Sequence, residues 1–330
     1  MDIGYPNTRN SDFRTHSRIY VAGHRGMVGS TLVRRLRAKG YANLILRTRQ
    51  ELDLSDQSAV SRFMESAEAD YVFVAAARVG GIVANNTYRG EFIYQNLTVQ
   101  TNLIHAAMRA GVRHLMFLGS SCIYPRDCPQ PIKEEYLLTG PLEHTNEPYA
   151  VAKIAGLKMC EAYNAQYGTR YVSVMPTNLY GPNDNYDPVS AHVLPALLRK
   201  AHLAKEEGAD SLTVWGSGRP RREFLHVEDM ADACILLMER GVGEGTYNIG
   251  SGTDVTIREL AETIARVVGF EGRLVFDASK PDGTPRKLLD VSRLRALGWQ
   301  PRFGLEEGIR RTYRHCIEEG VFGLVAAGHG

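Results

Sequence analysis

The sequence has no long apolar run, few cysteines, little tryptophan and almost no net charge. None of its apolar runs approaches the roughly 20 residues that a membrane-spanning helix needs. The net charge of +2 favours neither a nucleic acid nor a membrane surface as the partner. Residues 1–17 are polar and lack the apolar segment of a signal peptide, so we expect a flexible N-terminal extension there. These absences predict a soluble, cytoplasmic globular protein.

The cysteines are odd in number and have no paired spacing. The five are Cys122, Cys128, Cys160, Cys234 and Cys316. This usage is typical of reduced thiols in a cytoplasm-like compartment. No Cys-x-x-Cys or His-x-x-x-His pair indicates a metal site, and we expect none.

A glycine-rich turn follows the first apolar stretch. Residues 18–22 read as a short buried strand, and an amphipathic helix follows the turn and stops at Gly40. A strand, a glycine turn and a helix form the context of a dinucleotide-binding site, although the spacing G-x-x-G-x-x-G departs from G-x-G-x-x-G. The turn consists of Gly23, His24, Arg25, Gly26, Met27, Val28 and Gly29.

Strands and helices alternate through the first half of the chain, which predicts an α/β fold with a doubly wound, Rossmann-like parallel sheet. Ligands of such sheets bind at the carboxyl ends of the strands, where Gly23, Ala75, Gly119 and Pro176 fall. The further strands are expected at 43–47, 70–75, 114–118, 170–175 and 247–249, and the helices from about Ser55, at 92–110, around Tyr149 to 167, at 194–207 and at 257–268.

The amino-acid composition changes after residue 180, where Pro, Asn, Asp and Gly become frequent. We therefore expect a Rossmann-like domain at 18–180 plus about 224–250. The segments 181–223 and 251–330 are expected to form a smaller, discontinuous substrate-binding lobe.

Tyr149 and Lys153 lie four positions apart, so on a helix they share one face. An ammonium beside a phenol favours the phenolate, and we expect Lys153 to lower the pKa of Tyr149 and make it a general acid/base. Taken alone, this spacing is more often a surface pair. Ser120, just after the fourth strand, is placed to hydrogen-bond a substrate carbonyl, although a loop serine is usually only a turn former.

The residues after the second strand favour NADP(H). NAD-binding sheets place an acid there, whereas this chain has Arg49, whose guanidinium can pair with a 2′-phosphate. Arg25 can add a second positive contact, although both arginines could be ordinary surface charges. Asp53 and Leu54 are expected at the adenine edge.

Eight segments together resemble the extended short-chain dehydrogenase/reductases that act on nucleotide sugars. Among these, the chain is similar to the epimerase/reductases that convert GDP-4-keto-6-deoxy-D-mannose into GDP-L-fucose. The segments are 23–29, 79–86, 118–125, 146–153, 176–182, 215–218, 222–226 and 280–287. The resemblance implies epimerisation at carbons 3 and 5 and then reduction of the 4-keto group by NADPH.

The resemblance also implies roles for individual residues. Cys122 would be the base and His192 the acid of the epimerisation, although each alone is more often a packing residue. Lys200 and Arg222 would neutralise the diphosphate, with Trp215 and Asp282 also at the nucleotide end. Cofactor contacts would come from the glycine turn, Arg49, Asp53, Leu54, Leu118, Gly119, Ser120, Ser121, Tyr149, Lys153, Pro176, Thr177, Asn178, Leu179 and His192. A homodimer is implied by analogy.

Two other functions are compatible with parts of the pattern. A nucleotide-sugar 4-epimerase or dehydratase would keep NAD bound and return the hydride, but Arg49 and the combination of Cys122 with His192 argue against it. A non-catalytic NADP-binding regulator would not need Tyr149 or Lys153.

Overall fold

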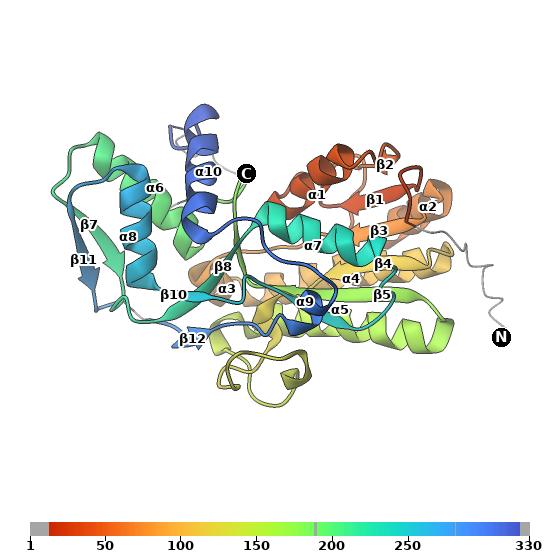
Figure 1. Ribbon diagram of the computed structural model, residues 1–330. Coiled ribbons are helices and arrows are strands. Elements are labelled where there is room, and N and C mark those ends of the chain that lie inside the picture. Colours follow the sequence, from red (N-terminus) through yellow and green to blue (C-terminus); the bar gives the residue numbers. More distant parts are fainter. Residues whose placement is uncertain (1–12, 188–189, 281, 324–330) are drawn as a thin grey trace.

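The computed structural model describes residues 13–187, 190–280 and 282–323, and its larger part is built on a six-stranded parallel sheet (Figure 1). The strand order is β2-β1-β3-β4-β5-β9. Three of its strands are buried along their whole length, as expected for a sheet covered on both faces. The bounds are β1 Ile19–Ala22, β2 Leu44–Ile45, β3 Tyr71–Val74, β4 His114–Leu118, β5 Arg170–Pro176 and β9 Thr246–Ile249.

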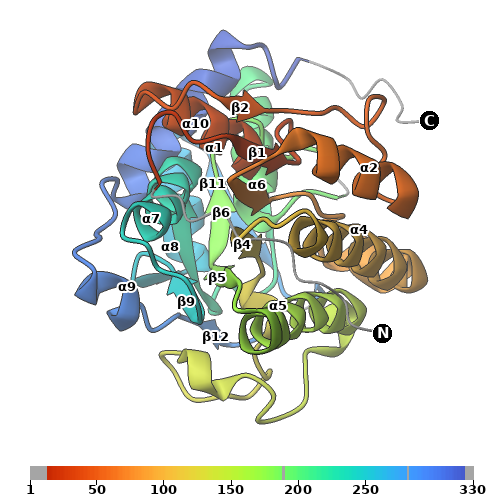
Figure 2. The ribbon, with the colours of Figure 1, turned by 90° about the vertical axis from the view of Figure 1, so that its right-hand side faces the viewer.

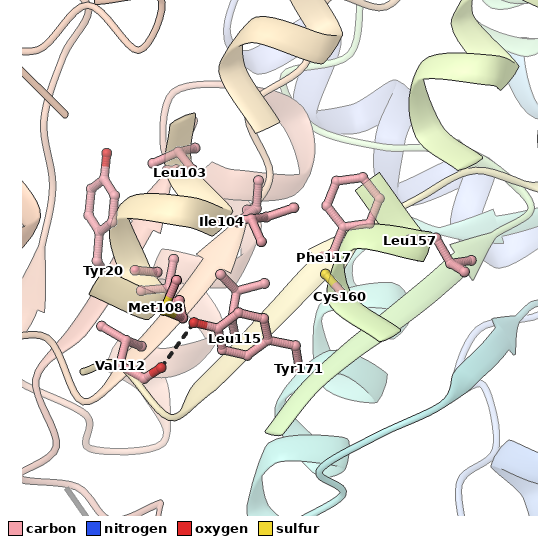
Figure 3. Close-up of a cluster of buried hydrophobic side chains, with 14 of the residues drawn as sticks. Tyr20, Leu103, Ile104, Met108, Val112, Leu115, Phe117, Leu157, Cys160 and Tyr171 are labelled. Carbon is pink, nitrogen blue, oxygen red and sulfur yellow. Dashed lines mark hydrogen bonds between the residues drawn. The ribbon is translucent and has the colours of Figure 1, made fainter. Parts of the chain in front are cut away.

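Helices cover both faces of this sheet, which confirms the doubly wound prediction. Figure 2 shows α4 and α5 side by side on one face, whereas α1 packs with α7 on the other. The core beneath α4 and α5 contains Leu103, Ile104, Phe117, Leu157 and Tyr171 (Figure 3). The bounds are α1 Met27–Ala38, α2 Gln57–Ala67, α3 Ile82–Thr87, α4 Arg89–Arg109, α5 Glu147–Tyr167, α7 Val227–Glu239 and α9 Ser292–Ala296, with 3₁₀ turns η1 Ser121–Ile123, η2 Glu134–Tyr136 and η3 His144–Asn146.

The smaller part has two small sheets and a separate apolar core. Strand β8 pairs with β6, β10 and β12, and β7 pairs with β11. Three helices pack around the core of this part. The bounds are β6 Asn178–Tyr180, β7 Ser211–Trp215, β8 Arg221–His226, β10 Asp254–Thr256, β11 Arg273–Asp277, β12 Arg286–Lys287, α6 Val193–Glu206, α8 Ile257–Val268 and α10 Leu305–Glu318.

Three details differ from the expectations. The N-cap of α2 is Asp56 instead of Ser55, and its carboxylate accepts a hydrogen bond from the Ala59 N–H at 2.9 Å. The expected lobe boundary at 223/224 falls inside β8. Residues 1–12 of the expected extension lie outside the described residues, but Phe13 is packed, with its ring 4.6 Å from that of Tyr71.

No helix in the described ranges is long and apolar enough to cross a membrane.

Candidate active site

The glycine turn leads from β1 into α1 and leaves no room for side chains at two points. Gly23 has φ +81°, a left-handed conformation that favours glycine. A Cβ on Gly29 would lie only 2.2 Å from the Gly23 carbonyl oxygen. This close packing brings the exposed N-terminus of α1 to the edge of the sheet, where its backbone N–H groups can receive a phosphate.

Two exposed arginines lie beside this turn and after β2. Within the described part of the chain, Arg25 and Arg49 form no hydrogen bond or ion pair, so both guanidinium groups are available to an anion. Asp53 is exposed, and its carboxylate is engaged by the Ser55 hydroxyl at 2.7 Å and the Ser55 N–H at 2.9 Å. These hydrogen bonds hold the pKa of Asp53 below its usual range. The neighbouring Leu54 is half-buried.

Tyr149 lies near the N-terminus of α5 and meets the turn that follows β4. It is hydrogen-bonded to Ser120, whose hydroxyl also accepts a hydrogen bond from the Cys122 N–H at 3.2 Å. Burial and the nearby Cys122 raise the pKa of Tyr149, and the hydrogen bond with Ser120 opposes them. Burial thus outweighs the groups that favour the phenolate, and the lowering of this pKa by Lys153 stays a prediction.

Lys153 is 3% exposed and lies one helical turn further along α5. Its ammonium donates a hydrogen bond to the Leu118 carbonyl at 2.8 Å and lies 4.9 Å from the centre of the Phe117 ring. The same ammonium is 5.9 Å from the centre of the Tyr149 ring. Burial lowers the pKa of Lys153 to about 8.

Cys122, in the larger part, contacts a residue of the smaller part. The Lys287 ammonium, on β12 of the smaller part, lies 3.5 Å from its sulfur. Burial lowers the pKa of His192, and the positive charge of Lys287 lowers it further. Arg222 on β8 also acts electrostatically on Cys122. Lys287 thus contacts Cys122, is paired with Arg222 on the neighbouring strand, and acts electrostatically on His192.

Lys287 was not identified as a site residue from the sequence. It ends the segment 280–287 that carries the family resemblance, but its contact with Cys122 spans 165 residues. No local spacing predicts such a contact.

A second cationic cluster surrounds Trp215, which is 55% exposed at the end of β7. The ammonium groups of Lys200 and Lys280 lie 4.9 Å and 5.5 Å from the centre of its ring. Lys280 is a further residue that the sequence did not single out. Asp282 accepts hydrogen bonds from the Ser217 N–H and hydroxyl at 2.6 Å and 2.7 Å, which place its carboxylate next to this cluster.

The segment after β5 lies at the same sheet edge and joins the two parts. Thr177 and Asn178 both donate side-chain hydrogen bonds to the Glu223 carbonyl on β8, at 3.2 Å and 2.8 Å. Gly119 and Ser121 follow β4 beside this segment, and a Cβ on Gly119 would lie 2.4 Å from the Met175 sulfur. Leu118, Pro176 and the glycine turn therefore lie along one edge of the parallel sheet. Leu179 lies just beyond this edge on β6, where it is paired with Leu225 of β8.

A parallel doubly wound sheet whose glycine turn and Tyr149/Lys153 pair share one edge defines the class of short-chain dehydrogenase/reductases. The chain matches the NAD dependent epimerase/dehydratase family over residues 19–250, and it belongs to that family.

Curated relatives cover most of the chain. The chain is 58% identical over 305 residues to "Putative GDP-L-fucose synthase 2" of Arabidopsis thaliana, which covers 92% of this chain and 93% of the relative. It is also 58% identical over 310 residues to "GDP-L-fucose synthase" of Escherichia coli (strain K12), and this match covers 91% of this chain and 97% of the relative. Among solved structures, a GDP-L-fucose synthetase from Naegleria fowleri bound to NADP is similar, with a TM-score of 0.85 and 27% identity. The match covers 96% of this chain and 98% of that structure's chain.

Proposed function

We propose that this chain converts GDP-4-keto-6-deoxy-D-mannose into GDP-L-fucose by epimerisation at carbons 3 and 5 and NADPH-dependent reduction at carbon 4. The observation that carries the proposal is the meeting of Cys122, Lys287 and the Ser120–Tyr149 pair at one sheet edge. A reductase alone needs no thiol beside its phenol. The names of the relatives support the same activity.

The site fits NADP(H). The crowded contact of Gly29 with Gly23 keeps the turn free of side chains for a pyrophosphate, and Arg25 and Arg49 are unpaired within the described residues. Leu54 and the exposed Asp53 would meet the adenine end. When bound, the cofactor supplies the hydride for carbon 4.

Tyr149 serves the reduction as the proton donor. Its raised pKa keeps the phenol protonated at neutral pH, so its O–H can donate to the oxygen at carbon 4 as negative charge develops there. Ser120, hydrogen-bonded to the phenol, completes the pair of donors at that oxygen. Lys153, charged below a pH of about 8, would hold the ribose hydroxyls beside them.

Cys122 and His192 serve the epimerisations. A proton next to a ketone is acidic because its removal gives an enolate, which the hydroxyls of Ser120 and Tyr149 can stabilise at the same oxygen. The Cys122 sulfur would take the proton, and the Lys287 ammonium lies beside it at 3.5 Å. His192 would return a proton to the other face of the carbon.

The smaller lobe would hold the nucleotide end of the substrate. Lys200 and Arg222 supply positive charge for the diphosphate, and Trp215 offers an exposed aromatic face. Asp282 and Lys280 lie beside that face. The two lobes would thus divide the work between cofactor and substrate.

The test is incubation of the purified chain with GDP-4-keto-6-deoxy-D-mannose and NADPH, followed by identification of the sugar. We expect GDP-L-fucose as the product and the oxidation of one NADPH per sugar formed, followed by the loss of NADPH absorbance. Turnover without loss of that absorbance would instead indicate a hydride-recycling epimerase or dehydratase. Tight NADPH binding with no turnover would indicate a non-catalytic regulator.

We also propose a homodimer that pairs α4 and α5 of two copies. Tyr94 on α4 and Val151 on α5 are 68% and 40% exposed, and pairing of these helices between two copies would cover both side chains. Sedimentation of the native chain and a Tyr94→Arg variant tests this, and we expect the variant to be monomeric. The five free thiols support a cytoplasmic location.

A further inference from the structure

Asn248, at the end of β9, is a fully buried amide in which every side-chain polar atom has a partner. Its Nδ2 donates hydrogen bonds to the carbonyls of Ile132 at 2.9 Å and Asp290 at 3.1 Å. Its Oδ1 accepts a hydrogen bond from the Tyr124 hydroxyl at 2.6 Å. Its backbone N–H is bound by the Glu134 carboxylate at 2.9 Å. A buried network so completely satisfied fixes the relative positions of its members.

The partners of Asn248 lie close in sequence to Cys122 and Lys287, the two residues in contact across the site. Tyr124 is two residues beyond Cys122, and Asp290 is three residues beyond Lys287. Ile132 strengthens the second connection, because its N–H donates to the Leu288 carbonyl at 2.7 Å. The Asn248 side chain therefore joins the chain segment of the thiol to the chain segment of the ammonium.

We propose that Tyr124 and Asn248 are positioning residues that hold the Cys122 sulfur against the Lys287 ammonium. Neither side chain contacts the thiol itself, so they act through the two segments that they tie together. The consequence for epimerisation rests on the proposed function, but the consequence for the reactivity of the thiol does not.

The Tyr124 hydroxyl is the part of this network that a variant can remove most cleanly. Tyr124 is 3% exposed, and burial raises its pKa, so the phenol stays protonated and donates to the amide. Tyr124→Phe keeps the ring and deletes only that donor. The amide oxygen is then unpaired in the interior, which frees the turn at 121–123 to move.

Tyr171→Phe is a matched control. Tyr171 is also buried, and its hydroxyl donates to the Val112 carbonyl at 3.0 Å in the core beneath α4, away from the site (Figure 3). Both variants lose one buried phenol hydrogen bond. A general loss of stability would therefore affect both equally.

The experiment measures the rate at which iodoacetamide alkylates Cys122 at neutral pH, with the modified peptide quantified by mass spectrometry. Because the native sulfur reacts from its place 3.5 Å from the Lys287 ammonium, we expect Tyr124→Phe, which loosens that contact, to slow alkylation about tenfold. Tyr171→Phe should match the native protein.

A second variant approaches the same contact from the Lys287 side. The Gln130 side-chain oxygen accepts a hydrogen bond from the Leu288 N–H at 2.8 Å and is only half-buried, so Gln130→Met is compatible with folding. We expect it to slow Cys122 alkylation by a similar factor. Native-like alkylation in both Tyr124→Phe and Gln130→Met would overturn the proposal.

Substrate measurements separate this proposal from the proposed function. Exchange of sugar protons with deuterated solvent should fall about tenfold in Tyr124→Phe, while NADPH affinity is unchanged. If the native chain does not act on the GDP-sugar at all, the proposed function fails. The alkylation rates still decide the role of Tyr124 and Asn248.

Discussion

At the scale of single residues, burial decides the protonation of the two groups that the sequence paired first. Tyr149 and Lys153 share one face of α5, as their spacing predicts. The Lys153 ammonium is hydrogen-bonded to the Leu118 carbonyl, and desolvation is the largest cause of the pKa shifts of both Tyr149 and Lys153. Sequence spacing shows which groups are neighbours, but the depth at which they lie depends on the packing of the whole sheet.

Lys153 should make folding stability depend on pH. Its pKa is about 8 in the folded protein and 10.5 ordinarily, so between these values the unfolded chain binds more protons. Stability therefore rises with pH across this window, and the native protein should gain up to about 3 kcal/mol relative to Lys153→Met. Urea unfolding at several pH values measures this difference. In Lys158→Met, an exposed position on the same helix, the rise should persist; its loss there would contradict the assignment to Lys153.

Cys122 and Tyr149 should separate the two stages of the reaction. Cys122→Ala removes the proposed base, so we expect exchange of sugar protons with deuterated solvent to fall at least about a hundredfold while NADPH still binds. Tyr149→Phe removes the proposed proton donor, so we expect hydride transfer to slow most. The decay of NADPH absorbance measures this rate. GDP-L-fucose formed at the normal rate by Cys122→Ala would exclude this thiol as the base.

At the scale of elements, the helices with clear end signals were predicted best. Helix α8 has the expected bounds, because Thr256 and Glu259 form a capping box at its start and Gly269 adopts a left-handed conformation at its end. Strands β6 and β8 were not predicted as partners. Their pairing joins Asn178 to Phe224, and such long-range register has no local signal in the chain.

The glycine turn supports a prediction about one element. Gly29→Ala puts a Cβ 2.2 Å from the Gly23 oxygen, and both atoms belong to backbone that cannot move without shifting β1 or α1. We expect NADPH affinity to fall at least about tenfold, measured by fluorescence titration. Gly90→Ala, a glycine with nothing within 4 Å of the added carbon, should bind NADPH normally. Equal affinities in the two variants would show that the turn is not the cofactor site.

At the scale of the whole molecule, the site is formed where the six-stranded parallel sheet meets the four-stranded sheet of the smaller part. Cys122 follows β4 of the parallel sheet, whereas Arg222 and Lys287 lie on neighbouring strands of the smaller sheet. The sequence indicated a change of composition after residue 180, and the family resemblance placed the nucleotide end beyond it. It could not show that Lys287 crosses back to the thiol, because that contact exists only once both lobes are packed.

This division predicts that binding of substrate and cofactor can be altered separately. Lys200 lies on α6 with its ammonium over Trp215, in the lobe proposed to hold the diphosphate. Lys200→Met keeps most of the side-chain length but removes the charge. One lost charge-assisted contact should raise the KM for the GDP-sugar about tenfold and leave the Kd for NADPH unchanged.

Lys205→Met is the matched control for this charge, because Lys205 is an exposed lysine on the same helix. Its KM should equal that of the native enzyme, since the Lys205 ammonium lies beside Gly269 at the end of α8, whereas the ammonium groups over Trp215 are those of Lys200 and Lys280. Steady-state kinetics at saturating NADPH measure KM, and fluorescence titration measures the cofactor affinity. A change of the NADPH Kd by the same factor as the KM would mean that the two lobes do not bind the two ligands independently.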